Sequence, residues 1–108
     1  MKAWDIYTAD IFGPHPCVLI SCQARIDRKP RVVVLQCRSL KPGQQHEAEP
    51  NEAILDEADG LDRKTICRCD LLYTVDKAGL GNKRGHVGSE RRRDIARKII
   101  QGLAIAGI

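Results

Sequence analysis

The stretch Thr65-Ile66-Cys67-Arg68-Cys69-Asp70-Leu71-Leu72-Tyr73-Thr74-Val75 decides the fold predicted for this chain. β-Branched, aromatic and apolar residues dominate it, a composition typical of a half-buried β-strand. Successive side chains of a strand point to opposite faces, so Arg68 and Asp70 project from one face, about 7 Å apart. The side chains predicted for the opposite, buried face are Cys67, Cys69, Leu71 and Tyr73.

Shorter apolar runs predict that this strand belongs to a mostly antiparallel sheet. The other predicted strands are Trp4 to Ile11, Cys17 to Ser21, Val32 to Cys37 and Ala53 to Leu55. Gly13-Pro14 indicates a tight connection between the first two strands, because Pro fixes φ and donates no hydrogen bond.

The hydrophobic period changes to that of a helix near the end of the sequence. The apolar residues that recur there at three- and four-residue intervals are Ile95, Ala96, Ile99, Ile100 and Leu103. We expect a helix from about residue 89 to 105, with Ser89 as its N-cap. The sequence thus predicts a mainly β fold of the α+β class, closed by one C-terminal helix.

Length and composition limit the class of protein. The chain has 108 residues, of which 43% are hydrophobic and 30% charged. This is about one domain's worth of sequence, so we expect a single domain over residues 1–108. No apolar run is long enough to cross a membrane, and the N-terminal segment lacks the apolar core of a signal peptide. We therefore expect a cytoplasmic protein without a membrane partner.

Charge is distributed unevenly along the sequence. The net charge is +4, but residues 47–62, the acidic segment, contain no Lys or Arg. Residues 83–98, the basic segment, contain seven basic and two acidic residues. Two interpretations fit this pattern equally well, two solvated faces or a surface that binds a polyanion.

The five cysteines do not form the pattern of a metal site. They are Cys17, Cys22, Cys37, Cys67 and Cys69. Their number is odd and their spacing is not that of a zinc-binding turn. We expect mostly buried, reduced thiols, no metal and no cofactor.

Arg68 and Asp70 are the first candidates for chemistry. A guanidinium and a carboxylate on one face of a strand form a structural ion pair more often than a catalytic pair. Spacing alone favours the structural interpretation.

The surrounding motifs resemble the MazF/PemK family of toxin endoribonucleases, part of the CcdB/PemK-like superfamily. Arg68-Cys69-Asp70 followed by Tyr73 to Gly81 is similar to the family's penultimate-strand motif, which begins with R-C-D in PemK-like members. Asp5 to Asp10 resembles its G-D-I-Y-x-V-D, His15 to Ser21 its R-P-V-L-V-x-S, and Val32 to Ser39 its V-I-V-A-P-I-T-S. These blocks keep the family's order along nearly the whole chain.

The resemblance implies an SH3-like, strongly curved antiparallel sheet, a homodimer and metal-independent cleavage of single-stranded RNA. It also implies a type II toxin–antitoxin pair, in which an antitoxin peptide blocks the toxin. The RNA 2′-hydroxyl attacks the adjacent phosphorus, so the enzyme supplies a base, an acid and positive charge. By match to the PemK-like motif, Asp70 takes the base position, and Arg68 the phosphate-binding and acid position.

The first loop departs from the family pattern. It is shortened to Phe12 to Pro16, and His15 stands where the family has its catalytic arginine. PemK-like members also use a histidine from this loop, and imidazole exchanges protons near neutral pH. His15 is therefore a third catalytic candidate, although it also fits as the cap of a tight turn.

The resemblance assigns RNA binding to two further residues. Arg38 occupies the position of the family's threonine, and Ser39 follows it. We expect His46 and His86 to be surface residues without a role.

Two functions remain open. The first is a toxin-like ribonuclease, favoured by the R-C-D motif and by His15. The second is a non-catalytic member of the same fold that binds a protein, as CcdB-type gyrase poisons do, or an inactive descendant; the shortened loop favours it.

Overall fold

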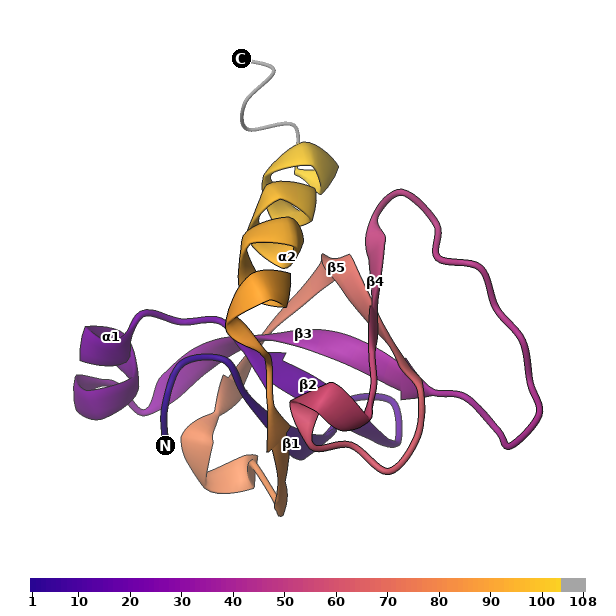
Figure 1. Ribbon diagram of the computed structural model, residues 1–108. Coiled ribbons are helices and arrows are strands. Elements are labelled where there is room, and N and C mark those ends of the chain that lie inside the picture. Colours follow the sequence, from indigo (N-terminus) through magenta and orange to yellow (C-terminus); the bar gives the residue numbers. More distant parts are fainter. Residues whose placement is uncertain (104–108) are drawn as a thin grey trace.

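The computed structural model describes residues 1–103. Its elements are β1 (Asp5–Asp10), β2 (Pro14–Leu19), α1 (Gln23–Arg28), β3 (Arg31–Ser39), β4 (Glu52–Leu55), the 3₁₀ helix η1 (Glu57–Asp59), β5 (Thr65–Asp76), the 3₁₀ helix η2 (Lys77–Gly79), β6 (Lys83–His86) and α2 (Ser89–Gly102). The strands form one six-stranded sheet in the order β4-β5-β3-β2-β1-β6, and all neighbours are antiparallel. The sheet curls strongly and α2 projects from it (Figure 1). The predicted curved antiparallel sheet with a C-terminal helix is confirmed.

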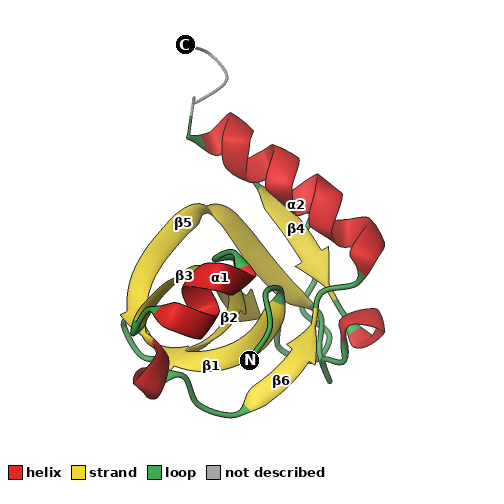
Figure 2. Cartoon of the chain, turned by 90° about the vertical axis from the view of Figure 1, so that its left-hand side faces the viewer, coloured by secondary structure: helices red, strands yellow, loops and turns green. Residues whose placement is uncertain are grey.

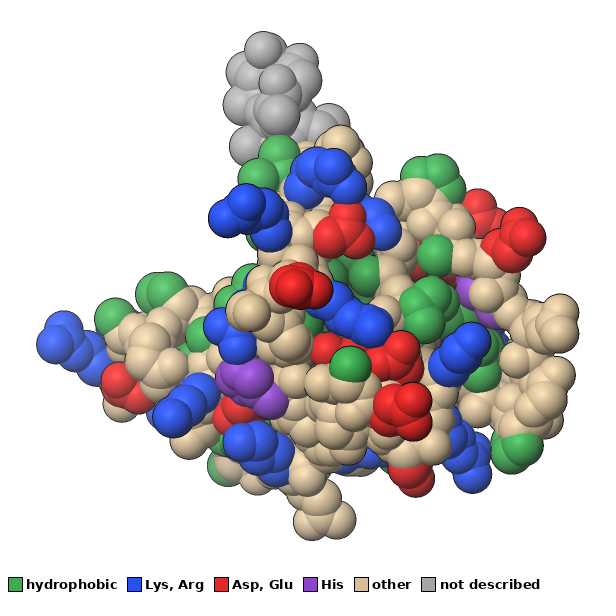
Figure 3. Space-filling model, in the orientation of Figure 1, with side chains coloured by type: hydrophobic (Ala, Val, Ile, Leu, Met, Phe, Trp, Pro, Cys, Tyr) green, Lys and Arg blue, Asp and Glu red, His purple; other side chains and the backbone are tan. Residues whose placement is uncertain are grey.

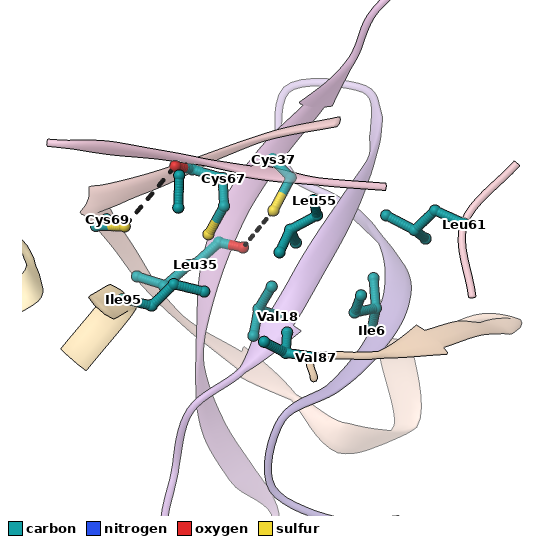
Figure 4. Packing of buried hydrophobic residues seen from close by; sticks show 11 residues of the cluster. Ile6, Val18, Leu35, Cys37, Leu55, Leu61, Cys67, Cys69, Val87 and Ile95 are labelled. Carbon is teal, nitrogen blue, oxygen red and sulfur yellow. Dashed lines mark hydrogen bonds between the residues drawn. The ribbon is translucent and has the colours of Figure 1, made fainter. Parts of the chain in front are cut away.

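Both faces of the curled sheet carry buried side chains, because adjacent residues of one strand pack into two different hydrophobic cores. The first core contains Ile6, Val18, Leu35, Cys37, Ala53, Leu55, Leu61, Cys67, Cys69, Val87 and Ile95 (Figure 4). The second core contains Ala9, Ile11, Cys17, Leu19, Ile26, Val32 and Val34. Ile95 anchors α2 on the first core, and Ile26 anchors α1 on the second, where α1 lies against the curled strands (Figure 2).

The longest strand, β5, is irregular where it passes β3. Cys37 pairs with Cys67 but Leu35 pairs with Leu72. An interval of two residues along β3 therefore lies opposite an interval of five residues along β5. The extra residues reverse the alternation of side chains, as in a bulge. The prediction that Tyr73 shares the buried face of Cys67 is therefore wrong, because Tyr73 packs against the second core.

The strand β6 and the helix α1 were not predicted, because neither has an apolar pattern. The strand β6 has the sequence Lys83-Arg84-Gly85-His86 and pairs with β1. A Cβ on Gly85 would lie 2.1 Å from the Asp59 carbonyl oxygen. Only glycine allows this close approach of η1 to β6. The helix α1 has six residues, and one of them, Ile26, is buried, which is too short for a detectable period.

The C-terminal helix begins as predicted but has a different cap. Gly88 is the N-cap, its backbone N–H donates to Asp59 Oδ1, and Ser89 is the first helical residue, so the assignment of Ser89 as N-cap is wrong. The helix ends at Gly102, and the rest of the predicted helix beyond residue 103 lies outside the described residues. None of the helices within residues 1–103 combines the length and apolar character needed to cross a membrane.

Candidate active site

Three neighbouring strands bring four polar side chains to one face of the sheet. β3 lies between β2 and β5, and Cys17 of β2 pairs with Gln36 of β3. His15 lies two residues before Cys17, and Arg38 two residues after Gln36, so both share the face of Gln36. Arg68 of β5 reaches the same face, because its Nη1 donates a hydrogen bond to Gln36 Oε1 at 3.3 Å.

The Arg68 guanidinium is oriented by a buried amide. Gln36 is 5% exposed, and its Nε2 donates to the Ile11 carbonyl oxygen at 3.1 Å while its Oε1 accepts from Arg68. The amide thus joins the β1–β2 turn to the guanidinium. Gln36 was missed from the sequence because a lone glutamine inside an apolar strand carries no motif.

His15 is held by the backbone of β3. Its Nδ1 lies 3.1 Å from the Cys37 carbonyl oxygen. A carbonyl only accepts, so Nδ1 carries the hydrogen and donates, which leaves Nε2 to exchange protons with a ligand. The ring is half-buried on β2, and its hydrogen bond crosses to β3 instead of capping its own turn.

Asp70 lies two residues after Arg68 on β5, and both point away from the face of Cys67 and Cys69. Its side chain is exposed, and it lies beside the last turn of α2, where a Cβ on Gly102 would be 3.2 Å from the Asp70 Cβ. Within residues 1–103, none of the ion pairs joins Asp70 to Arg68. The structural ion pair considered for these two residues is therefore absent from the described part of the chain.

Arg38 and Ser39 lie at the end of β3. Both are half-buried, and they pair across the sheet with Ile66 and Thr65 of β5. Consecutive residues of a strand alternate, so Arg38 faces the same side as Gln36, and Ser39 faces the other.

A second group of polar residues surrounds Glu52 on the edge strand β4. Glu52 of β4 pairs directly with Arg68 of β5. Glu52 Oε1 accepts hydrogen bonds from His46 Nε2 at 2.8 Å and from the Glu49 backbone N–H at 2.9 Å. His46 is thus half-buried and bonded, which corrects its assignment as a surface residue.

His86 links a buried carboxylate to the C-terminal helix. Its Nδ1 lies 2.8 Å from Asp5 Oδ1, and its Nε2 contacts Arg92 of α2. Burial raises the pKa of Asp5, but hydrogen bonds from the Lys2 backbone and from His86 lower it more, so the net shift is downward. His86 is thus a surface residue, as predicted, but it ties β6 to β1 and α2, which corrects the expectation that it has no role.

The acidic and basic segments meet in the fold, and part of their charge pairs. Arg91 Nη2 lies 3.1 Å from Asp56 Oδ2, and Arg91 Nη1 lies 3.2 Å from buried Asp59 Oδ2. Arg84 and Asp62 form a looser pair at 3.8 Å. Lys and Arg side chains on α2 lie next to acidic ones on the face shown in Figure 3. Part of the charge of the two segments is thus paired within the fold, other charged side chains such as Glu57 and Arg93 are exposed, and binding of a polyanion stays a prediction.

The cysteines are free thiols, four of them buried. Only Cys22 is exposed. Burial raises the pKa of Cys17 to about 11, and hydrogen bonding with Cys67 together with burial raises that of Cys69 well above its ordinary value. The prediction of buried thiols is confirmed for Cys17, Cys37, Cys67 and Cys69. Residues 1–103 contain no cluster of three or more His, Cys, Asp or Glu suited to a metal ion.

Three of the solved structures with a similar fold are a toxin and two complexes with an antitoxin or a MazE-MazF pair. An endoribonuclease from a mycobacterial species, in complex with its cognate antitoxin, matches with a TM-score of 0.82 and 20% identity, over 96% of this chain and 95% of that one. The Mycobacterium tuberculosis toxin MazF-mt6 matches with a TM-score of 0.79 and 17% identity, over 92% and 95%. The MazE-MazF structure from Deinococcus radiodurans matches with a TM-score of 0.73 and 13% identity, over 96% and 95%.

These identities establish the fold, and the family follows from a separate comparison. No curated protein matches the sequence significantly. A family model described as PemK-like, MazF-like toxin of type II toxin-antitoxin system matches residues 2–103. Because the match spans nearly the whole chain, the protein belongs to the PemK-like, MazF-like toxins of type II toxin–antitoxin systems.

Proposed function

We propose that this toxin is a metal-independent endoribonuclease that cleaves single-stranded RNA through the RNA's own 2′-hydroxyl. The observation that carries the proposal is the arrangement around β3, where His15 and Arg68 flank Gln36 on one face. An oriented imidazole and a fixed guanidinium supply the proton transfer and the positive charge that the reaction needs. Membership of the family supports the same chemistry.

Each step of the proposed reaction has a named group. Arg68 binds the scissile phosphate and stabilises the negative charge that develops on it. Asp70 accepts the proton of the 2′-hydroxyl while that oxygen bonds to phosphorus. His15 then donates a proton from Nε2 to the 5′-oxygen as its bond to phosphorus breaks. The products are a 2′,3′-cyclic phosphate and a 5′-hydroxyl end.

Arg remains protonated in proteins, so Arg68 acts as an electrostatic clamp and not as the acid. His15 is the better acid, because an imidazolium gives up a proton far more readily than a guanidinium, and the hydrogen bond from Nδ1 leaves Nε2 for the RNA. Arg38 and Ser39, at the end of β3, bind the neighbouring RNA backbone.

The proposed partners are a cognate antitoxin peptide and a second copy of the chain, in the cytoplasm. One similar structure is an endoribonuclease with its cognate antitoxin, and another is a MazE-MazF pair. Apolar side chains at the C-terminal end of α2 support the homodimer, because Ile100 of the helix and its C-cap Leu103 are 44% and 42% exposed.

A non-catalytic toxin that binds a protein is the second candidate. The observation in its favour is the turn of residues 11–13, which is all that separates β1 from β2. Phe12 in this turn is 88% exposed, has a φ of 54° and stacks edge-on with Tyr73 at 6.3 Å. An exposed aromatic ring on a short turn also suits contact with a protein.

Incubation with mixed-sequence single-stranded RNA in EDTA, followed by sequencing and end-group analysis, tests the proposal. We expect cuts at a short motif that leave a 5′-hydroxyl end. Intact RNA after incubation with folded protein would favour the protein-binding candidate.

A further inference from the structure

The phosphate-binding guanidinium of the proposed site has a carboxylate directly across the sheet. Glu52 and Arg68 are paired residues of antiparallel strands, so their side chains lie on the same face at neighbouring positions. The Glu52 side chain is 13% exposed. A carboxylate in this position competes with an RNA phosphate for the guanidinium.

The same carboxylate is held by an imidazole. His46 Nε2 lies 2.8 Å from Glu52 Oε1, and the Glu49 backbone N–H donates to the same oxygen at 2.9 Å. The His46 side chain is 25% exposed, so a proton can reach it from solvent. Protonation of His46 would place a positive charge against Glu52 and offset its charge.

Burial raises the pKa of the Glu52 carboxyl. The hydrogen bonds from His46 and a backbone N–H, together with the charge of Arg68, outweigh burial, so the net shift of the pKa is downward. Glu52 thus stays ionised at neutral pH. Histidine is the residue type whose charge changes in the physiological range, and the two histidines near Arg68 are His46, beside Glu52, and His15, beyond Gln36.

Other charged groups approach this pair from every neighbouring element. From α2, Lys98 Nζ donates to the Glu52 carbonyl oxygen at 2.8 Å and pairs with Asp94 at 2.9 Å. The remaining charged side chains lining the hollow beside His46 are Glu47 and Lys64. The hydrogen bond from Lys98 holds the pKa of Asp94 below its ordinary value, so Asp94 stays ionised at neutral pH.

We propose that Glu52 and His46 are positioning residues that set how strongly Arg68 binds RNA phosphate, with protonation of His46 strengthening the binding. When His46 is neutral, the uncompensated Glu52 carboxylate weakens the attraction between Arg68 and phosphate. When His46 is charged, that carboxylate is balanced and Arg68 attracts phosphate fully. The inference rests on the proposed RNA-binding role of Arg68.

The test measures the affinity for an uncleavable 2′-O-methyl RNA oligonucleotide between pH 5.5 and 8.0. Glu52→Gln keeps the shape of the side chain and removes its charge. We expect it to tighten binding at pH 8.0 about fivefold, within the usual range of couplings between sites, and to remove the part of the pH response that depends on His46. His46→Gln leaves Glu52 uncompensated and is expected to keep binding weak at pH 5.5.

Glu49→Gln is the matched control, because it removes the same charge three residues away and keeps the backbone donor. It is expected to change affinity slightly and equally at every pH. In an Arg68→Ala background, Glu52→Gln is expected to have no effect beyond that of Glu49→Gln. The thermal unfolding midpoint is measured for each variant to check that it is folded.

The outcomes separate this inference from the proposed function. If the wild type binds RNA but Glu52→Gln and Glu49→Gln have the same affinity at every pH, this inference is overturned and the proposed function is not. The same holds if His46→Gln keeps the wild-type pH response. If folded wild type binds no RNA at any pH, the proposed function is overturned together with the inference.

Discussion

Arg68 Nη1 donates a hydrogen bond to Oε1 of Gln36 at 3.3 Å, and the Gln36 amide is buried between two strands. The same amide donates from Nε2 to the Ile11 carbonyl oxygen, so one side chain fixes both the guanidinium and the β1–β2 turn. Arg68 is therefore positioned from β3 and not by Asp70, its neighbour on the same strand. This relationship makes Gln36 as important to the proposed site as the residues of the R-C-D motif.

Gln36→Leu tests that relationship. The substitution keeps the volume but leaves Arg68 and the Ile11 carbonyl without their partner. We expect the rate of RNA cleavage to fall about 10- to 100-fold, the usual effect of losing the orientation of a charge clamp. Gln45→Leu, on the exposed loop before β4, is the control and is expected to leave the rate unchanged. Equal rates for both variants would show that Gln36 does not position Arg68.

The thiols differ in burial, so we expect them to differ in reactivity. The thiolate is the reactive form, and a raised pKa keeps buried Cys17 and Cys69 protonated. We expect iodoacetamide at pH 8 to modify the folded protein at Cys22 and to modify all five cysteines in urea. Peptide mass spectrometry locates the label, and Cys22→Ser should abolish labelling of the folded protein. Rapid labelling of Cys17 without denaturant would contradict this packing.

Asp5 makes stability depend on acid pH. Its folded-state pKa lies below the ordinary value of 3.8 despite burial, because Lys2 and His86 donate to it. A lowered folded-state pKa stabilises the fold at pH values above the ordinary pKa of 3.8. This stabilisation is lost as the pH falls through the lower, folded-state pKa. Urea unfolding of Asp5→Asn should show a loss of about 2 kcal/mol at pH 7 and a smaller loss near pH 3. Exposed Asp62→Asn is the control, and equal losses at both pH values for Asp5→Asn would contradict the assignment.

Arg91 connects α2 to the acidic segment, and its removal leaves Asp59 buried without a counter-charge. The Asp59 side chain is 0% exposed, and the Arg91 side chain is 32% exposed. We expect Arg91→Met to lower the free energy of unfolding by about 2 to 3 kcal/mol, below the range for fully buried pairs. Arg93→Met, an exposed position on the same helix, is the control. Similar unfolding curves for the two variants would exclude a stabilising role for the pair.

Much of the fold follows from local sequence patterns, because strands buried on one or both faces are apolar. Thr65 to Val75 predicts β5, and the spacing of Ile95 and Ile99 predicts α2. β6 has no such pattern, since its place in the sheet depends on backbone pairing and on the close approach allowed by Gly85. The reversal of alternation within β5 is set by its register with β3, which no local pattern encodes.

The site was less predictable because its contacts join residues distant in sequence. His15, Arg38 and Arg68 were found through family motifs, whose order reflects this fold. Their partners Gln36 and Glu52 are separated from Arg68 by 32 and 16 residues, and neither lies in a motif. Only the pairing of β3, β4 and β5 brings these groups together.

The central claim is that Arg68 clamps the phosphate during RNA cleavage, and the cleavage rates of wild type and Arg68→Ala in EDTA test it most directly. Asp70→Asn and His15→Gln, measured alongside, assign the proton-transfer groups. We predict that wild type cleaves single-stranded RNA and that Arg68→Ala is at least about 10²-fold slower, with a nearly unchanged thermal midpoint. No cleavage by the wild type, or equal rates for wild type and Arg68→Ala, would contradict the account.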